Sequence, residues 1–360
     1  MQFYPKLLYI IVIDKIIVLI TEADIAKVDQ ERLHLIYDKW PVYFKDAEKI
    51  PCKLDHEPDF YESIILCGIG GSATSCDILN DLLHSFSNVN STVLKGQDMP
   101  FFVDKRSLVI VNSISGNTLE AISMVEKASE RNAEVICISS GGKLKEVAAK
   151  NSHRHIHIPN LSLPRASLPY LIMPGLNLIK PFLKKSLEEE ISSIHRSISN
   201  IAKDISARVP EESNIAKKIA SFLENGFVFC FTSPYLMSVG TRFKNSLNEN
   251  AKVHCVKESV LEASHNEIVP FTFYNNSFAA KVLLLEWVSD QTIVKERFKK
   301  VQCFLTRIKQ PLMELSIFEN TLLNAIICSI YILDYATIYM AISRKLDPSP
   351  TPAIDILKEV

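Results

Sequence analysis

The sequence predicts an α/β protein with two lobes, each built on a parallel β-sheet with helices on both of its faces. Short apolar segments alternate with longer amphipathic segments, which is the order of elements that gives a parallel sheet. Two of the predicted strands, at 63–68 and 108–111, end in polar turns that run directly into helices. The second half of the chain repeats this arrangement after a strand at 227–231. We therefore expect two doubly wound lobes of similar construction.

The first lobe is expected over residues 21–158 and begins with an amphipathic helix over 22–45. The run at 108–111 is apolar and largely β-branched, as expected of a strand that is buried on both faces. The other predicted strands of this lobe lie at 63–68, 91–95, 135–138 and 153–158. Its predicted helices lie at 72–85, 119–131 and 143–150.

The second lobe is expected over residues 175–360. Residues 159–174 contain four prolines and are predicted to link the two lobes. Predicted helices of the second lobe lie at 187–209, 213–223, 235–250 and 322–342, with a last short helix that ends at Lys358. Its predicted strands lie at 227–231, 253–256 and 279–285.

Two apolar segments resemble membrane spans. Residues 7–20 are interrupted by Asp14 and Lys15, and each half is too short to cross a bilayer. We interpret residues 1–20 as an N-terminal extension that the fold does not need, as a start codon placed too early would produce. The helix at 322–342 is long enough to span, but it contains an aspartate and several amide and hydroxyl side chains. We therefore expect it to be a core or dimer-interface helix.

Composition argues against several functions. The 360 residues carry a net charge of −1, which gives no electrostatic basis for binding nucleic acid or an anionic membrane. The eight cysteines are scattered, and none belongs to a Cys-x-x-Cys pair. We therefore expect free thiols in a reducing compartment, the cytoplasm.

The glycine turn at 68–73, Gly-Ile-Gly-Gly-Ser-Ala, joins a strand to a helix. Such a turn is typical of anion sites, because the free N–H groups and the positive end of the helix face the ligand. The turn also fits the loose fingerprint of dinucleotide-binding sites. That alternative requires an acidic residue at the end of the second strand, where Lys95 and Gly96 stand; the nearest acid, Asp98, is already in the loop.

The turn at 113–118, Ser-Ile-Ser-Gly-Asn-Thr, places three hydroxyl groups before a second helix. Hydroxyl groups donate well to phosphate oxygens, although a hydroxyl at a helix start is more often a simple N-cap. Because the two turns follow strands of one sheet, they are expected to converge where open α/β sheets bind ligands. The pair of turns therefore predicts a phosphate site.

At this point the sequence resembles a known family. The two turns are similar to the phosphosugar-binding turns of sugar isomerase (SIS) domains. With four further segments, in the same order, they resemble the archaeal-type bifunctional phosphoglucose/phosphomannose isomerases. Those segments are 164–167, 248–252, 264–267 and 347–358. The resemblance runs from about residue 20 to the C-terminus and implies two SIS-type lobes, with a C-terminal tail that returns to the active site.

The resemblance also implies roles for single residues. The residues that match the 6-phosphate site are Gly71, Ser72, Ser113, Ser115 and Thr118. Those that match catalytic positions are Arg165, Glu249, His265, Thr351 and Lys358. The family has a tyrosine commonly where Ile114 stands, and an asparagine is expected where Ser264 stands.

Each catalytic position implies a different task. Arg165 would stabilise the enediolate, and Glu249 would move the proton between C1 and C2. His265, contributed by the neighbouring subunit, would assist ring opening. Lys358 would lie near the ring oxygen, and Thr351 would allow both epimers at C2.

The residue types suit this chemistry. Isomerisation of an aldose to a ketose needs a base, and partial burial raises the pKa of a carboxyl group toward neutrality. Arginine is always protonated and can stabilise the negative intermediate, while a histidine titrates near neutral pH. Glu267 is a rival for the role of base, because it stands two residues after His265.

No metal or cofactor is required for this chemistry. The alternation of His153, His155 and His157 would place three imidazoles on one face of a strand. No carboxylate or thiol is near them in sequence, so we interpret this segment as an edge or surface strand rather than a metal site.

We therefore expect a cytoplasmic, metal-independent isomerase of hexose 6-phosphates that acts as a homodimer. One alternative is a non-catalytic sugar-phosphate sensor on the same lobes, which would need the two turns but not Arg165, Glu249 and His265 together. Another alternative, the isomerase part of an amidotransferase, would need an N-terminal cysteine nucleophile domain, which this sequence does not contain.

Overall fold

The computed structural model describes residues 20–273 and 279–359. The chain divides into two compact units. We call Lys39–His195 the central unit, and the residues through Asp38 together with Arg196–Val360 the terminal unit. The N-terminal extension predicted over 1–20 falls, except for Ile20, outside the described residues.

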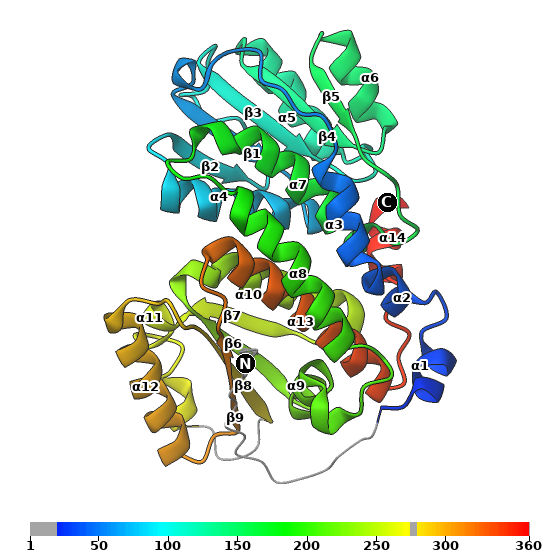
Figure 1. Cartoon of the computed structure of the whole chain (residues 1–360), viewed down its shortest axis with the longest axis vertical. Helices are drawn as coiled ribbons and strands as arrows, with labels where there is room; N and C mark the ends of the chain where they lie inside the picture. Colours follow the sequence, from blue (N-terminus) through cyan, green and yellow to red (C-terminus); the bar gives the residue numbers. More distant parts are fainter. Residues whose placement is uncertain (1–19, 274–278, 360) are drawn as a thin grey trace. The chain divides into compact units, whose positions relative to one another are not determined.

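The central unit contains a five-stranded parallel sheet in the order β2-β1-β3-β4-β5 (Figure 1). The strands are β1 (Ser63–Cys67), β2 (Asn90–Leu94), β3 (Ser107–Asn112), β4 (Glu134–Ser139) and β5 (Arg154–His157). The helices that follow them are α4 (Gly71–Phe86), α5 (Leu119–Glu130), α6 (Gly142–Lys150) and α7 (Leu168–Ile179). All five strands and the first three of these helices were predicted, with ends that differ by at most one residue.

The period-2 pattern of the strands explains how both faces of this sheet are covered. Ile65 and Cys67 of β1 lie in one core cluster with Met124 and Val125 of α5 and Leu144 of α6. Alternate residues of the strands are buried on the opposite face, where α4 and α7 pack together. Burial on both faces is why the strands are continuously apolar.

The linker predicted over 159–174 was wrong. These residues contain a 3-10 turn, Pro164–Ser167, and the first part of α7, which packs against α3 (Trp40–Glu48) and α4. Pro169 lies in the first turn of α7, where a helix loses no hydrogen bond to proline. The prolines therefore mark a helix start, and the division between the units falls within α8 (Glu188–Asp204).

The single helix predicted over 22–45 is three short helices. These are α1 (Glu22–Val28), α2 (Leu33–Asp38) and α3. The break occurs because the carboxylate of Asp29 accepts hydrogen bonds from the backbone N–H groups of Leu33 and His34, at 2.8 and 2.9 Å. Arg32 adopts a left-handed conformation with a φ of 55°, which ends the helical path.

The terminal unit contains a four-stranded parallel sheet in the order β7-β6-β8-β9. The strands are β6 (Phe227–Thr232), β7 (Cys255–Ser259), β8 (Ala280–Trp287) and β9 (Leu312–Ile317). The helices are α9 (Ile215–Leu223), α10 (Met237–Ser246), α11 (Val260–Ala263), α12 (Thr292–Arg307), α13 (Leu322–Ser343) and α14 (Pro352–Glu359). The two doubly wound α/β lobes of the predicted fold class are therefore confirmed.

The long apolar helix α13 is a core element of the terminal unit. It is the one helix of the described residues that is long and apolar enough to cross a membrane, and all of its apolar window is buried inside the fold. It packs against α9 and α10, and its polar residues Asp334 and Thr337 are fully buried with hydrogen-bond partners. The prediction of a core helix was correct.

Candidate functional site

The strand order of the central unit creates a switch point between β1 and β3. The chain continues from β1 to β2 on one side and then returns to add β3 on the other side. Turns that follow two such strands meet at the carboxyl edge of the sheet and lead to helices on opposite faces, so a ligand has room between them. The two turns that the sequence singles out follow these two strands.

The first turn brings the N-terminus of α4 close to the end of β1. A Cβ atom on Gly68 would lie only 3.0 Å from the backbone of Ser72 and Ala73, so the close approach requires glycine. Gly70 is the N-cap residue of α4, and no described side chain caps this helix. The first N–H groups of a helix without a side-chain cap are suited to bind an anion.

Three hydroxyl-bearing residues gather beside this helix end. The backbone N–H of Ile114 donates to the Ser72 hydroxyl at 3.4 Å, and the hydroxyls of Ser113 and Thr118 are 3.1 Å apart. Thr118 is the N-cap of α5, but among the described groups its hydroxyl caps no N–H of that helix. The simple N-cap alternative therefore does not hold for Thr118.

We call the set Gly71, Ser72, Ser113, Ser115 and Thr118 the anion cradle. Ser72 and Ser113 are buried, Gly71 and Thr118 are half-buried, and Ser115 is exposed. The Ser115 hydroxyl accepts the N–H of Asn117 at 3.2 Å. The structure thus gathers Ser72, Ser113 and Thr118 at one edge of the sheet.

A third turn, which the sequence analysis did not single out, supports the second one. It follows β4, and its Ser140 donates from both its N–H and its hydroxyl to the carbonyl of Ile114, at 2.9 and 2.7 Å. Gly116 has a φ of 68°, and a Cβ atom there would lie 1.9 Å from the carbonyl oxygen of Gly141. Gly116 and Gly141, one in each turn, are the sequence signal for this contact, because only glycine allows two backbones to approach so closely.

Two buried side chains connect the first turn to the end of β3. Asn112, the last residue of β3, donates to the hydroxyl of Ser75 at 2.7 Å, and that hydroxyl donates to the carbonyl of Ser72 at 2.6 Å. Both side chains are fully buried. This chain of hydrogen bonds connects the end of β3 to the first turn of α4, so the two halves of the anion cradle hold each other in place.

The corresponding switch point of the terminal unit lies between β6 and β8, and hydrogen bonds between protein groups occupy it. The turn after β6 contains Ser233, whose hydroxyl donates to the carboxylate of Asp290 at 2.5 Å. Asp290 follows β8 and also accepts the N–H of Trp287 at 3.1 Å. Burial raises the pKa of Asp290, and the hydrogen bonds from Ser233 and Trp287 oppose this shift. An internal carboxylate therefore takes the donors that a bound anion would use.

Arg165 lies in the central unit, in the 3-10 turn before α7. The turn is held by Trp40, whose indole N–H donates to the carbonyl of Ala166 at 3.0 Å. The Arg165 side chain is half-buried. A fixed turn of this kind gives a guanidinium a defined direction, which a cation that stabilises an intermediate needs.

Glu249 lies in the terminal unit, in a π-helical turn over Leu247–Ala251 that continues α10. Its side chain is half-buried, as expected for a carboxylate base. Such π-turns occur frequently at functional sites because they cost regular hydrogen bonding. The sequence analysis predicted a continuous helix to residue 250, so the π-turn is a feature that it missed.

The π-turn contacts the segment that leads to Thr351. The ammonium group of Lys252 donates to the carbonyl of Glu249 at 2.5 Å and to that of Pro348 at 3.2 Å. Thr351 is half-buried and directly precedes α14, where its carbonyl accepts the N–H of Ile354. Lys358 lies within α14, and its side chain is outside the described part of the chain.

His265 lies on a different element of the terminal unit, after α11. Its side chain is exposed, and its backbone N–H donates to the carbonyl of Glu262 at 2.9 Å. Glu267 is half-buried, and its N–H donates to the side-chain oxygen of Asn266 at 2.5 Å. The predicted site residues are therefore divided between the two units, with the anion cradle and Arg165 in one and the remaining four in the other.

The histidines near β5 contact serines. The Nε2 atoms of His153 and His155 lie 2.5 and 2.7 Å from the hydroxyls of Ser129 and Ser139. His157 is exposed. Within residues 20–273 and 279–359, no three histidine, cysteine or acidic side chains form a group that could hold a metal ion.

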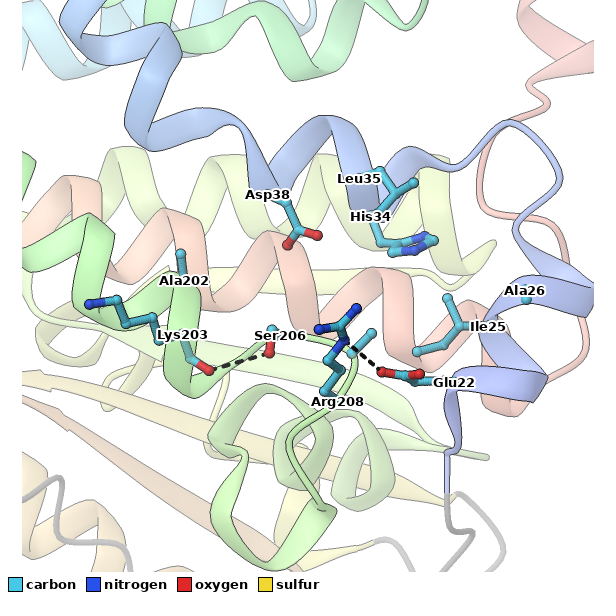
Figure 2. Close-up of a pocket in the computed structure, with 11 residues that line it drawn as sticks. Glu22, Ile25, Ala26, His34, Leu35, Asp38, Ala202, Lys203, Ser206 and Arg208 are labelled. Carbon is cyan, nitrogen blue, oxygen red and sulfur yellow. Dashed lines mark hydrogen bonds and ion pairs between the residues drawn. The ribbon is translucent and has the colours of Figure 1, made fainter.

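One pocket of the terminal unit contains no predicted site residue. It has a volume of about 550 Å³, and Figure 2 shows Glu22 paired across it with Arg208, whose Nε lies 3.2 Å from the carboxylate. Its walls come from α1, α2, the end of α8 and the segment after α8. The buried pair of His34 and Asp29, 2.6 Å apart, supports one wall. This pocket is therefore distinct from the residues that the sequence singled out.

The fold and the anion cradle together define the class of protein. Residues 61–161 match the model of the SIS domain family. Residues 212–360 match the model described as the bacterial phospho-glucose isomerase C-terminal SIS domain. The chain is therefore a two-lobe protein of the SIS class.

Similar curated proteins identify the family. A bifunctional phosphoglucose/phosphomannose isomerase of Thermoplasma volcanium is 30% identical over 304 residues, which cover 83% of this chain and 91% of the relative. One of Caldicellulosiruptor bescii is 29% identical, with 82% and 88% covered. The chain belongs to the bifunctional phosphoglucose/phosphomannose isomerase family, as the sequence analysis predicted, and the prediction of an isomerase is thereby confirmed.

One similar protein has a different name. A D-glucosamine-6-phosphate 4-epimerase of Sulfolobus acidocaldarius is 31% identical over 238 residues, which cover 65% of this chain and 71% of that protein.

Among solved structures, a hypothetical protein of Thermus thermophilus superposes with a TM-score of 0.71 at 15% identity, with 94% of this chain and 92% of the other covered. The structural likeness supports the fold.

Proposed function

We propose that this protein interconverts glucose 6-phosphate and mannose 6-phosphate with fructose 6-phosphate through a cis-enediol intermediate. Membership of the bifunctional isomerase family supports this reaction. The observation that carries the proposal is the anion cradle, because its hydroxyls and an uncapped helix N-terminus meet at the switch point of a parallel sheet. The 6-phosphate of the sugar is the group that would bind there.

The proton transfer is assigned to Glu249. Its carboxylate takes the proton from C2 of the open-chain aldose and returns it to C1, while the hydroxyl proton of O2 passes to O1, which produces the ketose. Arg165 stabilises the negative charge that develops on the enediolate oxygens between these transfers. The position of Glu249 in a π-helical turn supports this assignment, because such turns occur frequently at functional sites.

Ring opening is assigned to His265, contributed by the partner subunit of a homodimer. The exposed position of His265 supports this, since a side chain that acts in a neighbouring subunit must be on the surface of its own. We further assign Lys358 to the ring oxygen and Thr351 to the tolerance of both C2 epimers. The position of Thr351 beside the segment that Lys252 connects to the π-turn supports that role.

The reaction as proposed uses no metal and no cofactor. The protein would act in the cytoplasm, in glycolysis and gluconeogenesis, on hexose 6-phosphates. The scattered thiols, all eight of them free, fit a reducing compartment. A non-catalytic sugar-phosphate sensor on the same lobes is not favoured, because the similar proteins are named as enzymes.

The substitution Glu249→Gln tests the assignment of the base. It preserves the shape of the side chain but removes its basicity, so kcat for fructose 6-phosphate formation should fall by at least ~10² while KM changes little. Glu267→Gln is the matched control, because it makes the same change at the rival carboxylate and should leave kcat within about a factor of two. A reversed pattern, with Glu249→Gln active and Glu267→Gln inactive, would move the base to Glu267.

A further inference from the structure

The π-turn that presents Glu249 is fastened to α13 on both sides of that residue. One turn before it, the hydroxyl of Ser246 donates to the carboxylate of Asp334 at 2.6 Å. Directly after it, the side-chain amide of Asn250 donates to the hydroxyl of Thr337 at 2.8 Å. Asp334 and Thr337 are three residues apart in α13 and therefore lie on one face of that helix.

These contacts are buried and connected to one another. The side chains of Asn250, Asp334 and Thr337 have no exposed surface, and Ser246 is 4% exposed. The Thr337 hydroxyl donates to the carbonyl of Asp334 at 2.7 Å, which leaves its lone pairs free to accept from Asn250. Loss of one member leaves a buried donor without a partner, so the network favours a single arrangement of the π-turn.

A buried ion pair supports the same face of α13. The guanidinium of Arg242, one turn further back in α10, donates from Nε to both oxygens of Asp334 at 3.0 and 3.2 Å and from Nη2 at 2.8 Å. The hydroxyl of Tyr37 donates to Asp334 at 3.0 Å. Removing either charge would leave the other buried and unpaired, which is costly.

The charge of Arg242 reaches Glu249. Burial would lower the pKa of Arg242, but the negative charge of Asp334, with smaller contributions from Tyr37 and Glu249, raises it above its ordinary value. Arg242 is therefore protonated at every working pH, and Asp334 balances its charge inside the unit. The network therefore holds the turn that carries Glu249 and keeps both buried charges paired.

We propose that Asn250, Thr337 and Asp334 are positioning residues for the catalytic base, because they hold the π-turn that aims the Glu249 carboxylate at the carbon-bound proton. The inference rests on the proposed isomerase function and names residues that the family resemblance did not. A small displacement of a catalytic group is enough to lower a rate by about 10²-fold. Substrate binding through the anion cradle does not involve these residues. Substitutions of them should therefore lower kcat and leave KM nearly unchanged.

The pair Thr337→Val and Thr337→Ser tests this inference. Valine keeps the shape of threonine but removes the hydroxyl, whereas serine keeps the hydroxyl and loses only a methyl group. We expect Thr337→Val to lower kcat by about 10-fold or more with KM within about twofold, and Thr337→Ser to retain most of kcat. A purely structural role would lower thermal stability in both variants without separating their kcat values, and that result would overturn the inference.

A second variant keeps the test valid if Thr337→Val does not fold. Asn250→Ala removes the other partner of the same hydrogen bond, and it should lower kcat in the same way. Where all variants fold, the double variant should lose no more kcat than the worse single variant, because both changes break one contact. Independent, multiplying losses would contradict the proposal.

The wild-type assay separates this inference from the proposed function. If the wild-type protein converts hexose 6-phosphates and Thr337→Val has a normal kcat, the positioning role is wrong while the function stands. If the wild-type protein converts none of them, the proposed function is wrong and the positioning role fails with it.

Discussion

At the scale of single residues, the anion cradle depends on hydroxyl groups that mainly accept hydrogen bonds inside the protein. Ser72 and Ser113 both accept a backbone N–H, from Ile114 and Gly116. A hydroxyl that accepts one hydrogen bond can still donate its own hydrogen. Ser72 therefore has a donor available for a phosphate oxygen, and the pair of Ser113 and Thr118 has a second one, since only one of these two hydroxyls donates to the other.

The substitution Ser113→Ala should weaken substrate binding. Loss of a hydrogen bond to a charged phosphate costs about 1.5–3 kcal/mol, which corresponds to a rise in KM of about 10- to 100-fold. Because the phosphate is bound equally in the ground state and the transition state, kcat should change little. Ser87→Ala, at the opposite end of α4, is the matched control and should leave KM unchanged. A normal KM for Ser113→Ala would exclude Ser113 from the phosphate site.

The residues that sequence reasoning did not find have a shared property. Asn112, Ser140 and Arg242 belong to no motif, and Asn250 lies in the segment 248–252 without a role of its own; each acts through a partner distant in sequence. The hydroxyls of the two turns could be predicted because they directly follow predicted strands in the sequence. Partners such as Ile114 for Ser140 depend on how the strands are ordered, which the local pattern does not contain.

At the scale of elements, the strands and helices that alternate along the chain were predictable because apolar periodicity decides them. The exceptions have tertiary causes. The π-turn replaces the predicted end of α10 because Ser246 and Asn250 are bound to α13. The helix predicted over 22–45 breaks because Asp29 takes the N–H groups of Leu33 and His34. A period of 3.6 residues alone indicates neither event.

The edge strand β5 should make the stability of the protein depend on pH. Burial lowers the pKa of His153 below its ordinary value of 6.5. Burial, with repulsion from His157 and Lys145, lowers that of His155 in the same way. Between these lowered values and 6.5 the unfolded chain binds more protons than the folded one, so the free energy of unfolding decreases as the pH falls below 6.5.

Urea unfolding between about pH 7.5 and pH 5.5 measures this dependence. The double variant His153→Gln/His155→Gln should show a flatter decrease than the wild type, since it lacks both titrating groups. His157→Gln removes a neighbour whose charge lowers the pKa of His155, so it should also flatten the decrease, but by less than the double variant. A wild-type stability that rises as the pH falls over this interval would contradict the assignment.

At the scale of the whole molecule, the two sheets have the same construction but different switch points. In the central unit the donors of the turns after β1 and β3 surround an anion cradle. In the terminal unit the turns after β6 and β8 are joined by Ser233 and Asp290. This difference explains why a chain with two similar lobes is expected to bind one phosphate. The two lobes were predicted from the sequence. The difference between their switch points was not, because it depends on hydrogen bonds between residues that are distant in sequence.

Mixing two inactive variants tests whether His265 acts across a homodimer. In a mixed dimer of Glu249→Gln and His265→Ala subunits, one of the two sites would contain both an intact Glu249 and an intact His265. Random exchange should therefore restore about a quarter of the wild-type activity. Subunit exchange is verified by native mass spectrometry of the mixture. Exchange without any recovery of activity would show that the histidine acts within its own chain.

The measurement that tests the central claim most directly is a coupled assay of fructose 6-phosphate formation after treatment with EDTA. Glucose 6-phosphate and mannose 6-phosphate would be supplied separately, and 4-epimerisation of glucosamine 6-phosphate, which the epimerase relative suggests, would be followed in parallel by chromatographic separation of the hexosamine phosphates. We expect the protein to convert both glucose 6-phosphate and mannose 6-phosphate, with no loss of activity after the EDTA treatment. Turnover of glucosamine 6-phosphate alone, or tight binding of the hexose phosphates without turnover, would contradict the proposed function.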